Sequence, residues 1–250
     1  MTDSDRQKKI AAHRGLSGRY PENTLLAFEA AKQAGIIWIE TDVSMLKDET
    51  LILFHDEAQG RTVAGTKAVT QAVWKDFADA DAGLWKGQSF AGQRILRLSD
   101  FLSWVHDHEL CVHLEIKCHG GRQERTAERL ATVLDHASTD MIVISSFDLA
   151  FLSHLRTVDP QLRLASIHDE WPQNLSYLKD VLAVEAVHLD HHLVSCVSDV
   201  AAVHEQGLFL RTWTVNDRRR AEQLLDWGVD MVMSDYPDQL LISGLSPSFG

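Results

Sequence analysis

Nine short apolar runs alternate with helical patterns along this 250-residue chain, and the alternation constrains its fold more than any other feature. Runs of this kind, bounded by polar residues, are typical of buried β-strands. We predict strands at Lys9–His13, Ile36–Asp42, Leu51–Phe54, Leu110–Ile116, Met141–Ser145, Leu162–Ala165, Ala186–Leu189, Leu208–Trp213 and Asp230–Met233. We predict helices between most of them, including residues 24–34, 99–108, 123–136 and 217–227. Strands that alternate with helices indicate a parallel sheet.

The second and third predicted strands lie too close in sequence to be parallel neighbours. Only residues 43–50 separate them, whereas a parallel crossover needs about a dozen residues or more. We therefore expect an antiparallel hairpin that turns at Asp48-Glu49. In that register Asp42 faces His55 across the base of the hairpin.

Eight parallel strands remain when the third strand is set aside, and a (β/α)8 TIM barrel requires that number. The chain is long enough for one such domain, and its 45% hydrophobic residues can fill the core. We predict a single α/β domain over residues 1–250. Residues 56–98 contain no convincing barrel strand, so we expect them to form an insertion above the barrel mouth.

Composition and charge argue against several classes of protein. A formal charge of −12 repels polyanions, so we expect neither nucleic acid nor stable membrane association. The three cysteines, at positions 111, 118 and 196, form no Cys-x-x-Cys pair that would hold zinc. The N-terminal residues are polar, and the apolar stretch after them ends at His13, too soon for a signal peptide. We expect a cytoplasmic protein and leave a homo-oligomer open.

Acidic side chains occur where predicted barrel strands end, which is where such barrels place their chemistry. Glu40 and Asp42 point to the same side of one strand because residues i and i+2 do so. Glu115 and Lys117 form a second such pair. Three carboxylates suit Mg²⁺ or Ca²⁺, which prefer oxygen ligands.

Histidine, arginine and lysine side chains also occur at the ends of these predicted strands. His13 and His55 can transfer protons near neutral pH, and Arg14 and Lys117 can bind an anion. Together with the carboxylates they suggest metal-assisted chemistry on a phosphate ester. The alternative is a purely structural network of salt bridges among Glu40, Asp42, Glu115, Arg14 and Lys117.

These residues belong to an ordered series of motifs that resembles the glycerophosphodiester phosphodiesterase family, of the cytoplasmic bacterial type. The series extends from residue 9 to about residue 240. Its motifs are Ala12-His13-Arg14-Gly15, Pro21-Glu22-Asn23-Thr24, Glu40-Thr41-Asp42-Val43, Phe54-His55-Asp56, Leu114-Glu115-Ile116-Lys117, Ser145-Ser146-Phe147, Trp213-Thr214-Val215-Asn216 and Ser234-Asp235-Tyr236-Pro237.

The resemblance implies hydrolysis of glycerophosphodiesters, which are deacylated phospholipids, to glycerol 3-phosphate and an alcohol. It implies a divalent metal ion, Mg²⁺ or Ca²⁺, held by Glu40, Asp42 and Glu115. The implied acid and base are His13 and His55. The implied substrate-binding residues are Arg14 and Lys117 for the phosphate and Trp213 for the glycerol. The implied supporting residues are Glu22, Asn23 and Asp56.

Two features of the mechanism stay open at this point. Either histidine can be the acid, and the attacking oxygen is that of water or the glycerol 2-hydroxyl. The second route gives a cyclic phosphate first, as in the related phosphatidylinositol-specific phospholipases C. A lipid-directed phosphodiesterase, of the phospholipase C or lysophospholipase D type, is the alternative function. It would need an apolar rim, for which the candidates are Trp74, Trp85, Phe90 and Trp171.

Two other classes of barrel protein fit the sequence less well. A zinc amidohydrolase needs His-x-His at a strand end, but His106 and His108 lie on a predicted helix and point apart. A barrel that only binds phosphate would lack a histidine or a carboxylate, and all are present. The chain also departs from the family pattern at Leu96 and at residues 188–192, where we expect surface or supporting histidines.

Overall fold

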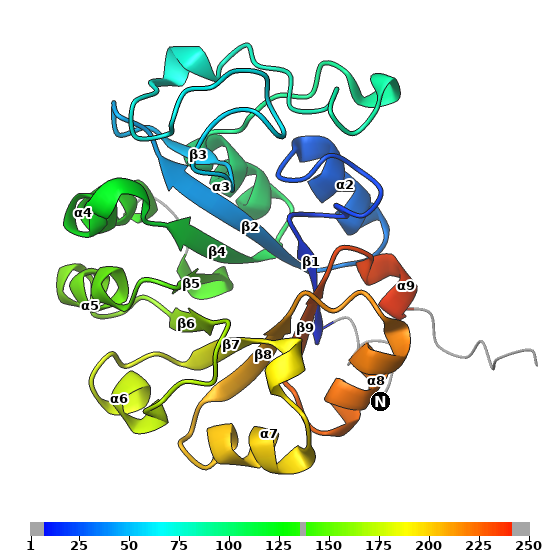
Figure 1. The fold of residues 1–250 in the computed structure, drawn as a ribbon, viewed down its shortest axis with the longest axis vertical. Coiled ribbons are helices and arrows are strands. Elements are labelled where there is room, and N and C mark those ends of the chain that lie inside the picture. The colour runs from blue at the N-terminus through cyan, green and yellow to red at the C-terminus, as the bar shows by residue number, and fades with distance from the viewer. Residues whose placement is uncertain (1–7, 136–138, 242–250) are drawn as a thin grey trace, which may run out of the picture.

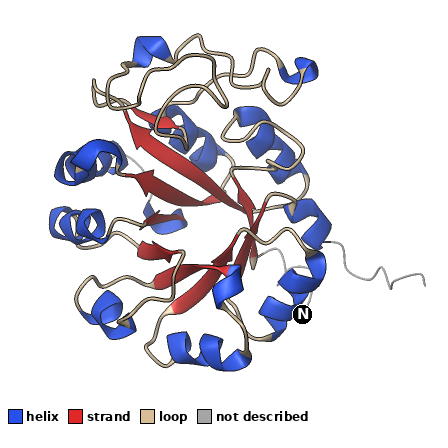
Figure 2. Ribbon diagram, in the orientation of Figure 1, coloured by secondary structure: helices blue, strands red, loops and turns tan. Residues whose placement is uncertain are grey.

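A nine-stranded sheet surrounded by helices forms the structure, a computed structural model in which residues 8–135 and 139–241 are described (Figures 1 and 2). The strands are β1 (Ile10–His13), β2 (Trp38–Met45), β3 (Leu51–Leu53), β4 (Cys111–Lys117), β5 (Ile142–Ser146), β6 (Leu164–His168), β7 (Ala186–Asp190), β8 (Phe209–Trp213) and β9 (Met231–Ser234). The helices are α2 (Leu25–Gln33), α3 (Leu98–Asp107), α4 (Gln123–Leu134), α5 (Leu149–Val158), α6 (Leu175–Asp180), α7 (Val197–His204), α8 (Arg218–Asp226) and α9 (Pro237–Leu241).

All strands except β3 are parallel and close into a barrel. Neighbours follow the order β1-β9-β8-β7-β6-β5-β4-β2, and β1 pairs with β2 to complete the ring. The predicted (β/α)8 TIM barrel is confirmed, and each predicted strand is present within a few residues of its expected bounds. The parallel arrangement brings the carboxyl ends of these strands to one mouth.

β2 is twice as long as β1, and the part of β2 beyond β1 carries the hairpin. Residues 38–40 of β2 pair with β1, and residues 43–45 pair with the antiparallel β3. Both partners use the same edge of β2, since β4 pairs with residues 38–44 on the other edge. The chain that follows β3 is therefore delivered to the barrel mouth.

The predicted antiparallel hairpin is confirmed, but its predicted register is wrong by one residue. Val43 pairs with Leu53, and the N–H of Phe54 donates to the carbonyl of Asp42 at 3.0 Å. Asp42 therefore faces Phe54 rather than His55. His55 follows immediately, and its imidazole is still near enough to lower the pKa of the Asp42 carboxyl.

The turn of this hairpin explains the error. It contains three residues, 47–49, because the N–H of Leu46 donates to the carbonyl of Thr50. Its last residue, Glu49, has a left-handed φ of 65°, which three-residue hairpin loops require at that position. Glycine is the usual signal for that conformation, and a glutamate does not reveal it in the sequence.

The segment between β3 and α3 is an excursion with a small hydrophobic cluster of its own. It contains two short 3₁₀ helices, η1 (Trp74–Asp76) and η2 (Gln88–Phe90), and lies at the top of Figure 1, beyond the hairpin. Side chains from the hairpin enter the cluster, so the two are packed together. The cluster consists of Leu46, Ile52, Phe54, Val63, Val69, Ala72, Phe77, Ala82 and Ile95.

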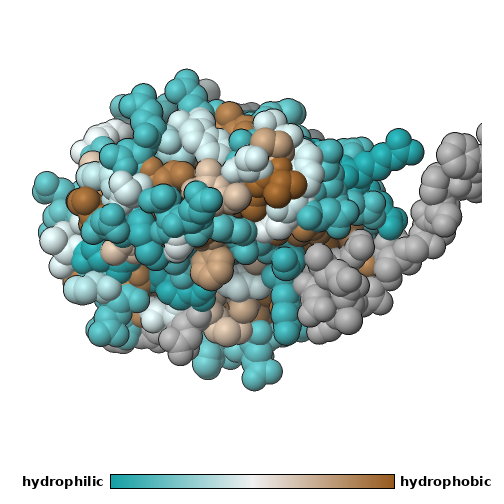
Figure 3. Space-filling model, turned by 90° about the horizontal axis from the view of Figure 1, so that it is seen from below, coloured by the Kyte–Doolittle hydropathy of each residue, from teal (hydrophilic) through white to brown (hydrophobic). Residues whose placement is uncertain are grey.

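The surface is mixed in character. Figure 3, which views the molecule from the side of α6 and α7, shows small hydrophobic areas among hydrophilic ones. Exposed apolar residues of these helices include Tyr177 and Val197. Among the described residues, no helix combines the length and the hydrophobicity that crossing a membrane requires.

α2 begins at the Pro21-Glu22-Asn23-Thr24 motif and fixes that motif against the barrel. The hydroxyl of Thr24 accepts a hydrogen bond from the N–H of Ala27 and so caps the helix. Phe28, one turn further on, is fully buried and packs on Phe101 of α3 at 4.7 Å between ring centroids. The packing of α2 on α3 thus supports the loop that carries the motif.

Replacing Phe28 with Ala is expected to lower the free energy of unfolding by about 3–5 kcal/mol, because a buried aromatic ring leaves a cavity. Urea denaturation followed by circular dichroism measures the change. Phe209→Ala is the matched control, since that ring is 51% exposed, and it should cost about 0.5 kcal/mol or less. Equal losses in the two variants would contradict this view of the core.

Candidate active site

Three carboxylates meet at the barrel mouth where β2 and β4 are neighbours. Asp42 pairs with Glu115 in the sheet register, and Glu40 lies two residues before Asp42 on the same side of β2. One oxygen of each of the three lies within 4.8 Å of the others. The arrangement expected from the i, i+2 spacing is present, and its geometry is compatible with one shared cation.

Two cationic side chains flank Asp42. Arg14 Nε lies 3.0 Å from one Asp42 oxygen, and Lys117 Nζ lies 3.2 Å from the other and also donates to Glu115. Burial alone would raise the pKa of Asp42, but these two cations hold it below its usual range. The salt bridges considered as an alternative therefore exist, and they involve the same carboxylates.

Glu40 has one oxygen that lacks both a hydrogen bond and an ion pair to the described residues, whereas the unbonded Asp42 oxygen still faces Lys117. Oε2 accepts from the N–H of Arg14 at 3.1 Å and lies 3.9 Å from Nε2 of His13. Oε1 is buried without a hydrogen bond to any described residue. Burial raises the pKa of Glu40 to about 8. A buried carboxylate oxygen without a donor fits a metal ligand, and both Mg²⁺ and Ca²⁺ accept such oxygen sets.

The loop after β1 directs Arg14 toward the acidic cluster. Arg14 and Gly15 both have left-handed φ angles, 56° and 81°. A Cβ at position 15 would lie 2.7 Å from the backbone carbon of Ala27, so only glycine fits there. Arg14 Nη1 also donates to Glu22 at 2.9 Å, and Glu22 thereby fixes the outer side of the guanidinium.

Asn23 holds Asp42 from the other side. Its amide donates to an Asp42 oxygen at 2.9 Å, and its own oxygen accepts from the hydroxyl of Thr41 at 2.8 Å. Its backbone, with a φ of 56°, donates to the carbonyl of Arg14. Asn23 therefore fixes the loop and the carboxylate together, as a supporting residue should.

His13 is oriented by Asp235, a residue whose role we did not predict. Nδ1 of His13 lies 2.6 Å from Asp235 Oδ1, and Asn216 and Ser17 donate to the same carboxylate at 2.7 and 3.0 Å. Burial disfavours the charged imidazole, but Asp235 and Glu40 raise the pKa of His13 above its ordinary value. The Ser234-Asp235-Tyr236-Pro237 motif was the available signal.

His55 is oriented by its own neighbour. Its Nδ1 lies 2.8 Å from Asp56 Oδ1. The other partner of Asp56 is Arg61, which donates to both of its oxygens and also to both oxygens of Glu22. Arg61 belongs to the insertion, and no predicted motif included it. Both histidines thus have a carboxylate behind Nδ1, which favours proton transfer at Nε2.

Trp213 lies at the end of β8 with a second aromatic ring beside it. Its indole N–H donates to the carbonyl of His188 at 3.2 Å, and its ring meets that of Phe147 edge to face at 5.7 Å between centroids. Phe147 is 43% exposed and lies 5.9 Å from Lys117 Nζ. The Ser145-Ser146-Phe147 motif and Trp213 therefore form an aromatic corner next to the Lys117 cation.

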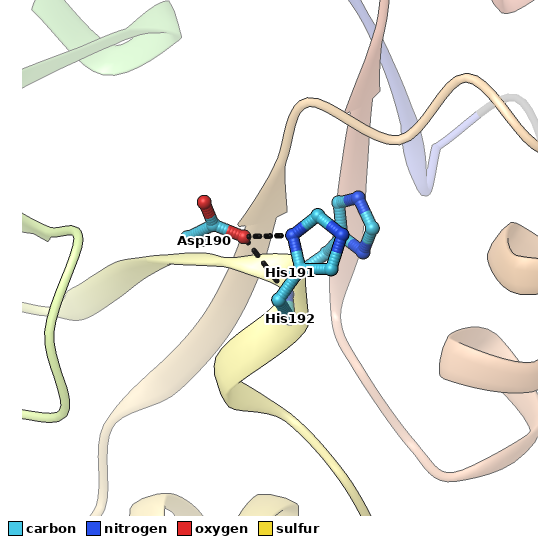
Figure 4. A group of neighbouring side chains, drawn as sticks. All are labelled: Asp190, His191 and His192. Carbon is cyan, nitrogen blue, oxygen red and sulfur yellow. Dashed lines mark hydrogen bonds and ion pairs between the residues drawn. The ribbon is translucent and has the colours of Figure 1, made fainter.

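A second group of side chains that could bind a metal ion lies at the end of β7 (Figure 4). Asp190, His191 and His192 bring one ligand atom each within 4.8 Å of the others. Asp190 already accepts from the backbone and ring of His192 at 2.8 Å, and Arg220 donates to His191 at 3.5 Å. A guanidinium beside the cluster opposes a metal ion. The partly exposed His191 and exposed His192 are surface histidines, as expected. His188 of the same stretch is buried, and its carbonyl accepts from Trp213.

Fold and side chains together define the class of protein. A TIM barrel presents three carboxylates, two carboxylate-backed histidines and two cations at the mouth where such barrels carry out chemistry. Such a set of groups is typical of an enzyme that acts on an anionic substrate. Imidazoles and cations in this arrangement are typical of sites that act on phosphate esters.

The chain belongs to the glycerophosphoryl diester phosphodiesterase family, whose match spans residues 13–239. It is 28% identical to a glycerophosphodiester phosphodiesterase of Caldanaerobacter subterraneus, across 93% of this chain and 96% of the relative. It is 30% identical to one of Bacillus altitudinis, across 92% and 96%. The structure of an Oleispira antarctica phosphodiesterase in complex with the product sn-glycerol-3-phosphate has a TM-score of 0.89 and 28% identity, across 96% and 98%. The predicted family and enzyme class are confirmed.

Replacing Asp235 with Asn should lower the pKa of His13, because the substitution removes the charge that stabilises the imidazolium. An NMR titration of the imidazole signals, in protein without added metal, measures the shift. Asp238→Asn is the control, since that carboxylate pairs with Arg19 instead. An unchanged or higher pKa of His13 in Asp235→Asn would contradict the pairing.

Proposed function

We propose that this chain hydrolyses glycerophosphodiesters to glycerol 3-phosphate and an alcohol, with a divalent metal ion as cofactor. The observation that carries the proposal is the convergence of the Glu40, Asp42 and Glu115 oxygens beside His13, Arg14 and Lys117. The Oleispira antarctica phosphodiesterase, described in complex with sn-glycerol-3-phosphate, supports the substrate class. We expect the barrel and its insertion to act as one domain. The cytoplasmic location of the protein stays a prediction.

In this proposal the three carboxylates hold the metal ion, which withdraws charge from the phosphoryl oxygens when bound. Arg14 and Lys117 bind the anionic phosphodiester at the same mouth. Glu22 and Asn23 keep the loop of Arg14 in place. Trp213 and Phe147 provide an apolar surface for the glycerol carbons.

The two histidines take different proton-transfer roles. Despite burial, the hydrogen bond to Asp235 raises the pKa of His13, which helps this imidazole to carry a proton, so we assign it to protonate the leaving alcohol. His55, oriented by Asp56, then takes the proton from the attacking hydroxyl at Nε2. The attacking group is water or the glycerol 2-hydroxyl, and trapping a cyclic phosphate identifies the second.

The lipid-directed alternative receives less support from the insertion. Trp74 packs against the cluster of the insertion, and Phe90 packs on Tyr20 at 5.9 Å. Trp85 is 38% exposed, but cations lie on its ring. Trp171 is 36% exposed and lies outside the insertion, between β6 and α6. An acyl chain needs a continuous apolar rim, and these aromatic rings do not offer one.

Glycerophosphocholine, glycerophosphoethanolamine and glycerophosphoinositol are the substrates for the direct test, with Mg²⁺, Ca²⁺ or a chelator. We expect metal-dependent release of glycerol 3-phosphate, and a loss of about 10²- to 10⁴-fold in kcat for His13→Ala. His204→Ala is the matched control, because His204, at the end of α7, pairs with Asp230 just before β9, outside the mouth. Turnover that survives chelation, or a fully active His13→Ala, would overturn the assignment.

Metal affinity should rise with pH up to about pH 8. Without metal, Glu40 keeps its proton below about pH 8, so binding must displace that proton. Isothermal titration calorimetry in buffers of different ionisation enthalpy measures the protons released. The number of protons released on metal binding should be largest below pH 8, and the release should vanish in the Glu40→Gln variant. Affinity independent of pH from 6 to 8.5 would contradict the protonated state of Glu40.

A further inference from the structure

Two cationic side chains of the insertion lie against one tryptophan and reach separate parts of the candidate active site. The guanidinium of Arg61 lies 5.8 Å, and Lys86 Nζ 5.5 Å, from the ring centre of Trp85. The indole N–H of Trp85 donates to the carbonyl of Ala82 at 2.9 Å, which fixes the ring within the insertion. Each cation also forms hydrogen bonds to segments at the barrel mouth.

Arg61 connects the insertion to His55 and Arg14. Its N–H groups donate to Asp56 at 2.8 and 2.9 Å and to Glu22 at 2.7 Å twice. Asp56 in turn contacts His55, and Glu22 contacts Arg14. One guanidinium therefore joins the segment after β3 to the loop after β1. These two segments are not paired with each other in the sheet.

Lys86 connects the insertion to His13. Its Nζ donates to the carbonyl of Ser17 at 2.7 Å. The single hydrogen of the Ser17 hydroxyl is shared between the His13 carbonyl at 2.6 Å and Asp235 at 3.0 Å, and Asp235 contacts the His13 ring. Lys86 therefore acts on the backbone that holds the first histidine and its carboxylate.

The contacts of Arg61 assign it a positioning role rather than a substrate-binding one. A guanidinium has five N–H donors, and hydrogen bonds to two carboxylates occupy four of them. The planar, bidentate geometry fixes both carboxylates relative to each other, which a lysine at this position would not do. Arg61 lacks the free donors that binding a phosphate would need.

We propose that Arg61, Trp85 and Lys86 are positioning residues through which the insertion sets the geometry of both histidines. The proposal rests on the function assigned above, because it gives the insertion a part in that same reaction. Arg61 acts on His55 through Asp56, and Lys86 acts on His13 through Ser17. Trp85 holds the two cations on one rigid ring.

Kinetics of single variants provide the first test. Arg61→Ala should lower kcat about 10- to 100-fold, since a misplaced His55 transfers protons poorly. KM should change much less, because the Arg14 contact with Glu22 remains. Arg61→Lys should still have a reduced kcat, with a smaller loss than Arg61→Ala. Added guanidinium ion should partly restore the kcat of Arg61→Ala. Lys86→Ala should lower kcat about 3- to 10-fold.

The controls are two cations of the same insertion with no contact to the site. Arg94 binds the carbonyls of Asp79 and Ala80, and Lys67 pairs with Asp76. Arg94→Ala and Lys67→Ala should leave kcat unchanged. If they lower kcat as much as Arg61→Ala and Lys86→Ala do, or if Arg61→Ala keeps full kcat, the positioning role is wrong.

NMR of the imidazole rings tests the same inference without turnover. Arg61→Ala should shift the ring signals of His55 but not those of His13, and Lys86→Ala should do the reverse. Trp85→Ala should shift both sets. If the parent protein hydrolyses no glycerophosphodiester, the proposed function fails while these shifts still report on positioning. Unperturbed rings in all three variants would overturn the inference.

Discussion

The buried carboxylate of Asp42 is the contact point on which the candidate site depends. Arg14, Lys117 and Asn23 all bind it, and they come from the loop after β1, from β4 and from the start of α2. An unpaired charge at this depth would cost several kcal/mol, so the surrounding segments must stay where they are. The same side chain that joins these elements also faces Glu115, so folding and the assembly of the acidic cluster are one event.

Much of the fold and part of the site follow from local sequence patterns. Apolar runs revealed the strands, and the period of two placed Glu40 beside Asp42 and Glu115 beside Lys117. The hairpin was also deducible, because eight residues cannot form a parallel crossover. Its register was not, since that depends on the left-handed φ of Glu49, a residue type that gives no turn signal.

The sequence patterns did not reveal the roles of Asp235 and Arg61, because the partners of these residues are remote in sequence. Asp235 and His13 are 222 positions apart, and only closure of the barrel through β1 and β9 brings them together. Arg61 and Glu22 are 39 positions apart and meet through the insertion, whose path has no strand or helix periodicity to predict it. Motif order predicted which side chains come together at the strand ends, but not which side chains hold them in place.

Charge balance explains why the acidic cluster and the proton on Glu40 belong together. Six carboxylates lie at the mouth, and in the described part of the chain the arginine and lysine side chains that form ion pairs with members of this group are Arg14, Arg61 and Lys117. The six are Glu22, Glu40, Asp42, Asp56, Glu115 and Asp235; Glu40 and Asp235 pair with His13 instead. A protonated His13 reduces the excess of negative charge but does not remove it. Glu40 is buried and lacks the Arg14 Nε and Lys117 contacts that Asp42 has, so burial raises the pKa of Glu40, to about 8, but not that of Asp42. In the proposed function a divalent ion would supply the missing charge, so proton and metal would be alternative partners of the same buried oxygens.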